Sequence, residues 1–215
     1  MHIPQSAIAD QTILPFADAL CLANDRQNDY DTEKWLYVPP TYGEYRYLLG
    51  TRGKRPLICI GINPSTAAPD DLDNTLKSVS RIAAANGFDS WMMMNVYAQR
   101  ATKPDDMDNA VCEELHRENM AALEYLLQHT QTPAAIWAAW GAIIEKRAYL
   151  SACVRDMVAL GEKYGAIWLK AGKVSKVGHP HHPLYLRSDT PVEPLDIDAY
   201  LDVLDTLYVS KRRNK

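Results

Sequence analysis

The sequence predicts an α/β protein, a three-layer α/β/α sandwich with a largely parallel sheet. Two observations support this fold class. Short, continuous apolar runs rich in β-branched residues are typical of strands that are buried on both faces of a sheet. These runs alternate with segments of helical apolar periodicity that are long enough for the right-handed crossovers joining parallel strands.

The N-terminal part of the domain is expected to supply two strands. Residues 45–49 alternate in hydrophobicity and are followed by Gly50, which indicates a strand and its end. Residues 57–62, with the sequence LICIGI, form a continuous apolar run and are expected to be a strand buried on both faces. Residues 1–44 are polar, and we expect an N-terminal extension that packs on the domain.

Helices and further strands follow in alternation. A helix is expected from Asn74, because Leu76, Val79 and Ile82 fall on one helical face and Gly87 follows as a stop signal. Further strands are expected over residues 91–96, 134–140 and 166–169, and further helices over residues 109–129 and 143–163. The sequence therefore predicts an α/β domain over residues 45–190 and a C-terminal helix with a basic tail over residues 191–215.

The composition limits the classes of partner that the protein is expected to bind. The formal net charge is −4 and the pI about 5.9, so the composition gives no support to the broad basic face that a long nucleic-acid backbone requires. The run Lys211-Arg212-Arg213 is expected to be a solvated tail. No apolar run is long enough to span a bilayer and no secretory signal is visible, so no membrane partner is expected. The four cysteines are scattered, and we expect reduced thiols and a cytoplasmic location.

In a parallel sheet the ligand lies beyond the carboxyl ends of the strands, and the first such end is GINPS. This segment is neither a dinucleotide fingerprint nor a P-loop. The Asn63 amide offers an acceptor and two donors, so it could orient a water or bind the ring of a base, and Pro64 would fix the backbone that presents it. The alternative is a simple turn, in which Ser65 or Thr66 caps the next segment.

The second candidate segment is GHPHHPLYL, residues 178–186. An extended loop that carries one imidazole into a pocket would donate a hydrogen bond to developing negative charge or move a proton. A rigid proline-rich loop with solvent-facing histidines is one alternative. A metal site formed by His179, His181 and His182 is another, although no carboxylate or cysteine partner stands at ligand spacing.

The third candidate segment follows residues 91–96. Asn95 ends a buried strand and needs hydrogen-bond partners, and it either ties the loop down or contacts a ligand. Arg100 could hold a phosphate or a carboxylate, or pair with one of the acidic residues before the helix at Asn74. These acidic residues, which are Asp70, Asp71 and Asp73, are expected to be solvated at the start of that helix, and a hard-cation site is the alternative.

Four blocks, GINPSTA, NVYAQRAT, AAWG and GHPHHPLYL, occur in this order over residues 45–186 and resemble the domain of unknown function 1643 family. In that family one histidine is expected directly before Pro-Leu-Tyr, which matches His182. More distantly, the layout is similar to the uracil-DNA glycosylase superfamily. There a Gly-x-Asn-Pro motif at a strand tip positions or activates a water, and a late His-Pro loop contacts the base and the sugar–phosphate backbone. Gly61, Asn63 and Pro64 match the first motif.

The resemblance implies a uracil-DNA-glycosylase-like fold and hydrolysis of an N-glycosidic bond in a nucleobase-containing small molecule or nucleic acid. Asn63 and His182 are expected to be catalytic. Residues expected to bind the substrate are Gly61, Pro64, Ser65, Asn95, Arg100, Thr102 and Tyr185. No cofactor and no metal are expected. A non-catalytic nucleotide or nucleic-acid binding module and a metal-dependent hydrolase remain the alternatives.

Overall fold

The computed structural model describes the backbone of residues 1–213 and the side chains of residues 1–207. Within these residues lies a seven-stranded sheet with the order β1-β2-β4-β3-β5-β6-β7. The strands are β1 (Trp35–Val38), β2 (Leu48–Thr51), β3 (Pro56–Gly61), β4 (Ser90–Asn95), β5 (Ala135–Ala138), β6 (Ile167–Ala171) and β7 (Val192–Pro194). The central strands β4, β3, β5 and β6 pair in parallel, and the edge pairings are antiparallel. The predicted α/β class with a mostly parallel sheet is confirmed.

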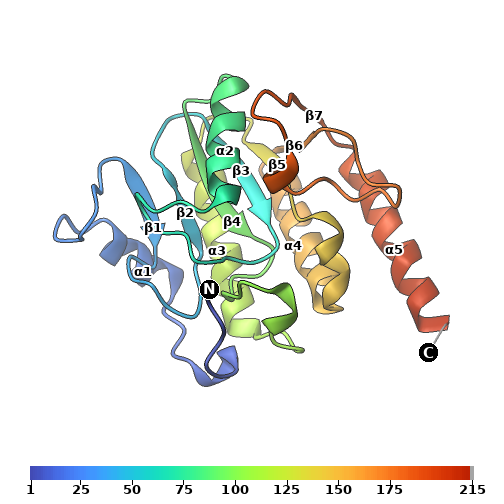
Figure 1. The fold of residues 1–215 in the computed structure, drawn as a ribbon, viewed down its shortest axis with the longest axis horizontal. Coiled ribbons are helices and arrows are strands. Elements are labelled where there is room, and N and C mark those ends of the chain that lie inside the picture. The colour runs from blue at the N-terminus through green and yellow to red at the C-terminus, as the bar shows by residue number, and fades with distance from the viewer. Residues whose placement is uncertain (214–215) are drawn as a thin grey trace.

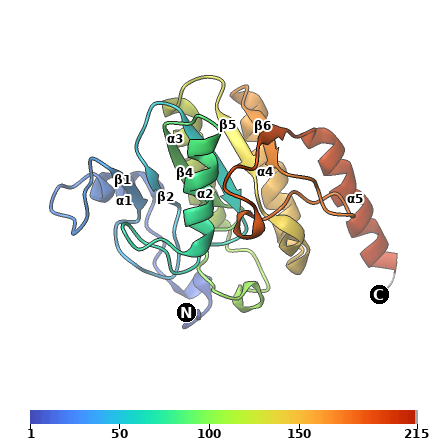
Figure 2. The ribbon, with the colours of Figure 1, turned by 45° about the horizontal axis from the view of Figure 1, so that its top comes forward.

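Helices cover both faces of the sheet (Figures 1 and 2). They are α1 (Phe16–Ala23), α2 (Asn74–Ala85), α3 (Glu113–His129), α4 (Tyr149–Lys163) and α5 (Ile197–Arg213). Helix α2 packs on one face, whereas α1, α3 and α4 pack on the other, with α5 beside α4. Among the described residues, no helix combines the length and the apolar character that a membrane span requires.

The burial of strand β3 on both faces explains why its sequence is apolar at every position. Leu57 and Cys59 pack in the cluster that contains α2, and Ile58 and Ile60 pack in the cluster that contains α3 and α4. All four side chains are fully buried. A strand with a helix layer on each face has no solvent-facing side, so the usual alternation of polar and apolar residues is absent. The prediction of a doubly buried strand at residues 57–62 is confirmed, with a shift of one residue.

The boundaries of several elements differ from those predicted. Residues 109–112 do not belong to α3, which begins at Glu113. The helix expected over residues 143–163 is divided into a 3-10 helix, η3 (Gly141–Lys146), and α4. Arg147 between them is extended, and its guanidinium donates to the backbone carbonyls of Met107 and Asp108. These tertiary hydrogen bonds hold the segment in a non-helical conformation that periodicity alone does not reveal.

The sheet also reaches beyond the strands that the sequence indicated. The strand expected over residues 45–49 begins at Leu48, because Tyr45 makes only an isolated bridge to Gln99. Strand β1 comes from the segment expected to be an extension and pairs with β2, while β7 pairs with β6 at the other edge. The side chains of the basic run at residues 211–213 lie outside the described residues.

Gly50 in β2 provides a test of packing between strands. A Cβ at this position would clash with the carbonyl oxygen of Trp91 and lie 2.7 Å from Met92 Cα. Backbone atoms of a central strand cannot move aside easily, so we expect Gly50→Ala to lower the free energy of unfolding by about 1–3 kcal/mol or more. Urea unfolding measures this change. Gly43→Ala is the control, because nothing lies within 4 Å of its Cβ and little change is expected there.

Candidate ligand pocket at the carboxyl edge of the sheet

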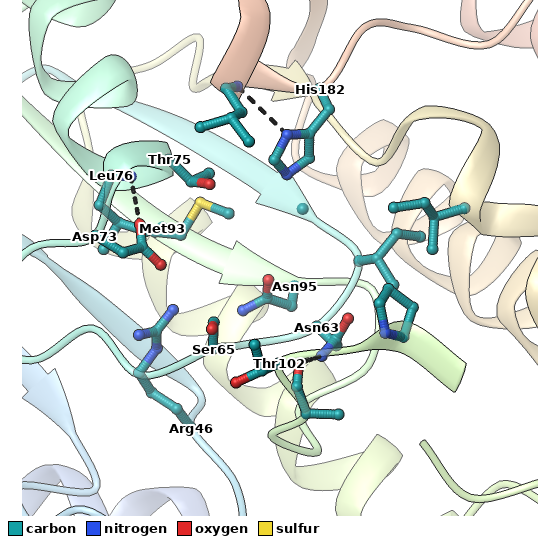
Figure 3. A pocket seen from close by; sticks show the side chains of 16 residues that line it. Arg46, Asn63, Ser65, Asp73, Thr75, Leu76, Met93, Asn95, Thr102 and His182 are labelled. Atoms are coloured by element: carbon teal, nitrogen blue, oxygen red, sulfur yellow. Dashed lines mark hydrogen bonds between the residues drawn. The ribbon is translucent and has the colours of Figure 1, made fainter. Parts of the chain in front are cut away.

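A pocket of about 230 Å³ lies at the carboxyl edge of the sheet (Figure 3). Helix α2 follows β3 onto one face and α4 follows β5 onto the other, so the chain diverges at this edge and leaves a crevice. The pocket is lined by Arg46, Gly61, Ile62, Asn63, Ser65, Asp73, Thr75, Leu76, Met93, Asn95, Ala101, Thr102, Pro104, Ile143, His182 and Leu184. Segments far apart in the sequence therefore meet where a parallel sheet is expected to bind its ligand.

Asn63 joins the end of β3 to the loop after β4. Its Nδ2 donates to the carbonyl oxygens of Ala101, at 2.6 Å, and of Pro64, at 3.2 Å. Because the amide nitrogen is occupied by backbone, Oδ1 remains as a hydrogen-bond acceptor, and it points into the pocket (Figure 3). The side chain thus has a half that stabilises the turn and a half that faces the pocket, and the two interpretations of the sequence are compatible.

His182 presents its ring to the same pocket from above, in the view of Figure 3. Its Nδ1 accepts a hydrogen bond from the backbone N–H of Leu184 at 3.3 Å, at the start of the 3-10 helix η4 (Pro183–Tyr185). In the neutral ring the proton must then reside on Nε2, which is a donor toward the pocket. Burial lowers the pKa of His182 below its ordinary value, while the nearby carboxylate of Asp73 opposes this shift. The imidazole is therefore a neutral donor at physiological pH.

The lowered pKa of His182 predicts a pH dependence of stability. Below about pH 6.5, the unfolded chain protonates this residue whereas the folded chain resists protonation. The unfolded state then binds more protons, so the free energy of unfolding falls as the pH decreases from about 6.5 toward the folded pKa. We expect this loss in the wild type and a smaller loss in His182→Gln, as measured by urea unfolding across the range. Equal losses in both proteins would contradict the assignment.

Asn95 is fully buried at the end of β4, and neither of its amide atoms has a hydrogen-bond partner among the described residues. It faces the pocket between His182 and Arg46 (Figure 3). A buried polar group without a partner costs about 1–3 kcal/mol, so its persistence needs an explanation. Asn95 lies opposite Gly61 in the register of β3 and β4, and a Cβ at residue 61 would approach Asn95 Oδ1 to 3.1 Å. Glycine at this position therefore leaves space beside the Asn95 amide.

The other predicted binding residues divide into two groups. Ser65 and Thr102 line the pocket, although the Thr102 hydroxyl accepts the backbone N–H of His2 at 2.7 Å. Pro64 and Tyr185 are not among the lining residues, and Tyr185 is 86% exposed. Proximity in sequence to Asn63 and His182 therefore does not place these two side chains in the pocket.

Arg100 is fully buried but is not among the pocket-lining residues. Its guanidinium donates to the carbonyl oxygen of Ser65 and to the Tyr37 hydroxyl, the latter at 2.9 Å. It also lies 4.3 Å from the centre of the Tyr42 ring. These contacts hold the segment after β3 in place. Asp70, one of the acidic partners considered for it, instead pairs with Lys34 Nζ at 2.8 Å.

The three histidines of the late loop occupy different environments. His179 is buried, with Nε2 2.9 Å from a carboxylate oxygen of Glu145 and Nδ1 3.1 Å from the Tyr200 hydroxyl, so it anchors the loop to η3 and α5. His181 is exposed and His182 faces the pocket. Within the part of the chain that the structure describes, no three His, Cys, Asp or Glu side chains are grouped so as to hold a metal ion.

Two charged pocket residues were not singled out as site residues from the sequence. Asp73 caps α2, since its Oδ1 accepts the backbone N–H of Leu76 at 2.9 Å, and it also lines the pocket. The position of Asp73 directly before the expected helix was the sequence feature that could have identified it as a capping residue at this edge. Arg46 stands within a run that alternates like a strand, and it carries no sequence signal that distinguishes a pocket residue from a surface one.

Comparison with known proteins gives one match. Residues 46–184 match a family model described as a protein of unknown function (DUF1643). The matched segment begins at Arg46 and ends at Leu184, so it contains all the residues that line the pocket. No curated protein and no solved structure matches the chain significantly.

Proposed function

The chain belongs to the DUF1643 family, and from its pocket we propose that it hydrolyses an N-glycosidic bond in a nucleobase-containing substrate. One observation carries the proposal: the Oδ1 acceptor of Asn63 and the Nε2 donor of His182 face one pocket that also contains the unpartnered amide of Asn95. The finer fold assignment, similarity to the uracil-DNA glycosylase superfamily, is part of the proposal. It rests on the match of Gly61-Ile62-Asn63-Pro64 and of the late His-Pro loop to that superfamily's motifs.

Asn95 is the residue suited to recognise the base. A primary amide offers one acceptor and two donors in a plane, which complements the carbonyl and ring N–H of a lactam-type base edge. The pocket volume of about 230 Å³ is below the roughly 300–1,000 Å³ typical of sites for drug-sized ligands. It suits a single ring system with its attached group better than an extended cofactor. A base within a duplex would have to leave the stack, at a cost of a few kcal/mol.

The reaction follows from the remaining groups. Asn63 Oδ1 accepts a hydrogen bond from a water and orients its oxygen toward the sugar carbon, to which a new C–O bond forms. The glycosidic C–N bond breaks and its electron pair leaves with the base. His182 Nε2–H donates to the negative charge that develops on the base, and an oriented donor of this kind contributes about 100-fold to 1,000-fold in rate. Asn63 cannot accept the water's proton. Once the C–O bond forms, this proton passes by way of solvent to the departing base anion, so the products are the neutral base and the sugar hydroxyl.

The wild-type protein provides the direct test. We expect it to release a free base from at least one member of a panel containing damaged and modified DNA, nucleosides and nucleotides, with the product detected by chromatography. The same panel is applied in thermal-shift experiments. Absence of base release across the panel would contradict the proposed reaction.

The second candidate function is a non-catalytic module that binds the same class of ligand. The hydrogen bond of Asn63 Nδ2 to Ala101 favours it, since a residue with a purely structural and binding role would be held in the same way. Saturable thermal shifts by a nucleotide without any release of base would support this candidate over the hydrolase.

A further inference from the structure

Arg46 is a buried cation that faces the pocket without an acidic partner. Its side chain is 1% exposed, yet it is among the residues that line the pocket. Nη1 donates to the carbonyl oxygen of Ala67 at 3.0 Å, whereas Nε is buried with no hydrogen-bond partner. Among the residues that the structure describes, no carboxylate lies within ion-pair distance of this guanidinium.

The surroundings make the charge of Arg46 costly. Burial, followed by the positive charge of Arg100, lowers the pKa of Arg46 to about 9, and the opposing influences of Tyr37, Asp73 and Tyr42 are smaller. The group is still a cation at neutral pH. A buried charge is normally paired, because its transfer out of water is unfavourable unless a counter-charge and hydrogen bonds compensate. An anionic ligand would supply both to Arg46.

The position of Arg46 shows which part of a ligand it would contact. In Figure 3 the guanidinium lies across the pocket from His182, with Asn95 between them. The Ser65 and Thr75 side chains are also part of the lining. A base held at Asn95 and His182 would thus direct a substituent of the sugar toward Arg46.

We propose that Arg46 forms an anion subsite for a phosphate of the nucleobase-containing ligand. The substrate is then a phosphate ester, which is either a free nucleotide or a nucleic acid with its backbone phosphate. It is not a free base or a nucleoside. Arginine suits this role because its planar guanidinium can donate two parallel hydrogen bonds to phosphate oxygens. This proposal rests on the proposed function for the identity of the base, but the affinity for the anion is independent of turnover.

Asp73 is the group that opposes an anion in the pocket. Its Oδ1 is engaged by the backbone N–H of Leu76, and its negative charge acts on the buried guanidinium of Arg46. Asp73 also caps the N-terminus of α2, whose dipole is favourable to negative charge at that end. The charge of Asp73 is therefore partly compensated at the start of α2, and Asp73 forms no ion pair with Arg46 in the described part of the protein.

Binding of inorganic phosphate tests the subsite without reference to any reaction. Calorimetry with the wild type, Arg46→Gln and Arg46→Lys is expected to show saturable binding that weakens about tenfold or more in Arg46→Gln. Arg46→Lys keeps the charge but loses the bidentate geometry, so an intermediate affinity is expected. Arg26→Gln is the control, because Arg26 is 87% exposed and the same unit of charge is removed at the surface. Equal affinities in the wild type and Arg46→Gln would overturn the proposal.

A measurement on the wild type covers the case in which Arg46→Gln does not fold. The Nε–H resonance of Arg46, observed by NMR and assigned with Arg46→Lys, is expected to shift on titration with phosphate because Nε is free to donate. An unchanged resonance at saturating phosphate would overturn the proposal.

Paired ligands then distinguish the two sources of phosphate. In the wild type, a nucleoside monophosphate is expected to bind at least about tenfold more tightly than its nucleoside. In Arg46→Gln, the two ligands are expected to bind with the same affinity. If a short single-stranded oligonucleotide gains this advantage and the mononucleotide does not, the phosphate belongs to a nucleic-acid backbone. If neither gains it, the subsite is refuted. Phosphate-dependent binding with no base release would contradict the hydrolase alone.

Discussion

Replacing Asn63 by alanine is expected to abolish base release while the protein remains folded. The substitution removes Oδ1, the acceptor that would orient the attacking water, and misplacing a reacting group by about 1 Å already costs about 100-fold in rate. It also removes the hydrogen bonds to the Ala101 and Pro64 carbonyl oxygens, each worth about 0.5–1.5 kcal/mol of stability. We therefore expect at least a 100-fold loss of activity together with a modest loss of stability.

The measurement is the initial rate of base release on the best substrate of the panel, with circular dichroism and urea unfolding on the same samples. Asn28→Ala is the matched control, because Asn28 is half-buried like Asn63 and its amide also donates to two backbone carbonyls. Wild-type rates in Asn63→Ala would show that Asn63 acts only as a turn residue.

Replacing Asn95 by leucine is expected to change stability and binding in opposite directions. Leucine has a similar shape, and the substitution removes two buried polar atoms that lack partners in the described part of the protein. We expect the free energy of unfolding to increase by about 1–3 kcal/mol. We expect nucleotide affinity to fall by more than about tenfold, since the base would face an apolar group. Gains of stability at the expense of ligand affinity are characteristic of functional sites.

Asn119 in helix α3 offers a control for this prediction. It is as deeply buried as Asn95, but its Nδ2 donates to the Asn95 and Val96 carbonyl oxygens, the former at 2.8 Å. Asn119→Leu should therefore lower the free energy of unfolding, whereas Asn95→Leu should raise it. Urea unfolding and calorimetry with nucleotides measure the two properties separately. If both variants are destabilised to the same extent, Asn95 is a structural residue.

Local sequence predicted those elements whose extent is determined by their own residues and immediate neighbours. Strand β3 and helix α2 were predicted closely, because one is buried on both faces and the other begins at Asn74 directly after the capping residue Asp73. Elements that depend on a distant partner were predicted less well. The break before α4 depends on the hydrogen bonds of Arg147 to residues about 40 positions earlier. Strand β1 acquires its role in the sheet only by pairing with β2.

The same distinction applies to the pocket. Asn63, Asn95 and His182 were singled out because each follows or ends a segment that the parallel-sheet rule directs to one edge, and the structure brings all three to one pocket. Tyr185 and Pro64 share those segments, but their side chains are not among the pocket residues. Whether a side chain in a loop points inward depends on backbone dihedral angles that residue type does not specify.

Apolar periodicity and short motifs are local properties of the chain, and they were sufficient to predict the α/β class, the family and the segments that meet at the carboxyl edge of the sheet. The state of the individual side chains emerged from the three-dimensional packing. The amide of Asn95 has no partner among the described residues, the neutral ring of His182 directs Nε2 toward the pocket, and Arg46 is buried beside that pocket instead of lying on the surface. Burial and hydrogen-bond partners depend on residues far away in the chain, and these determine which polar groups remain available to a ligand.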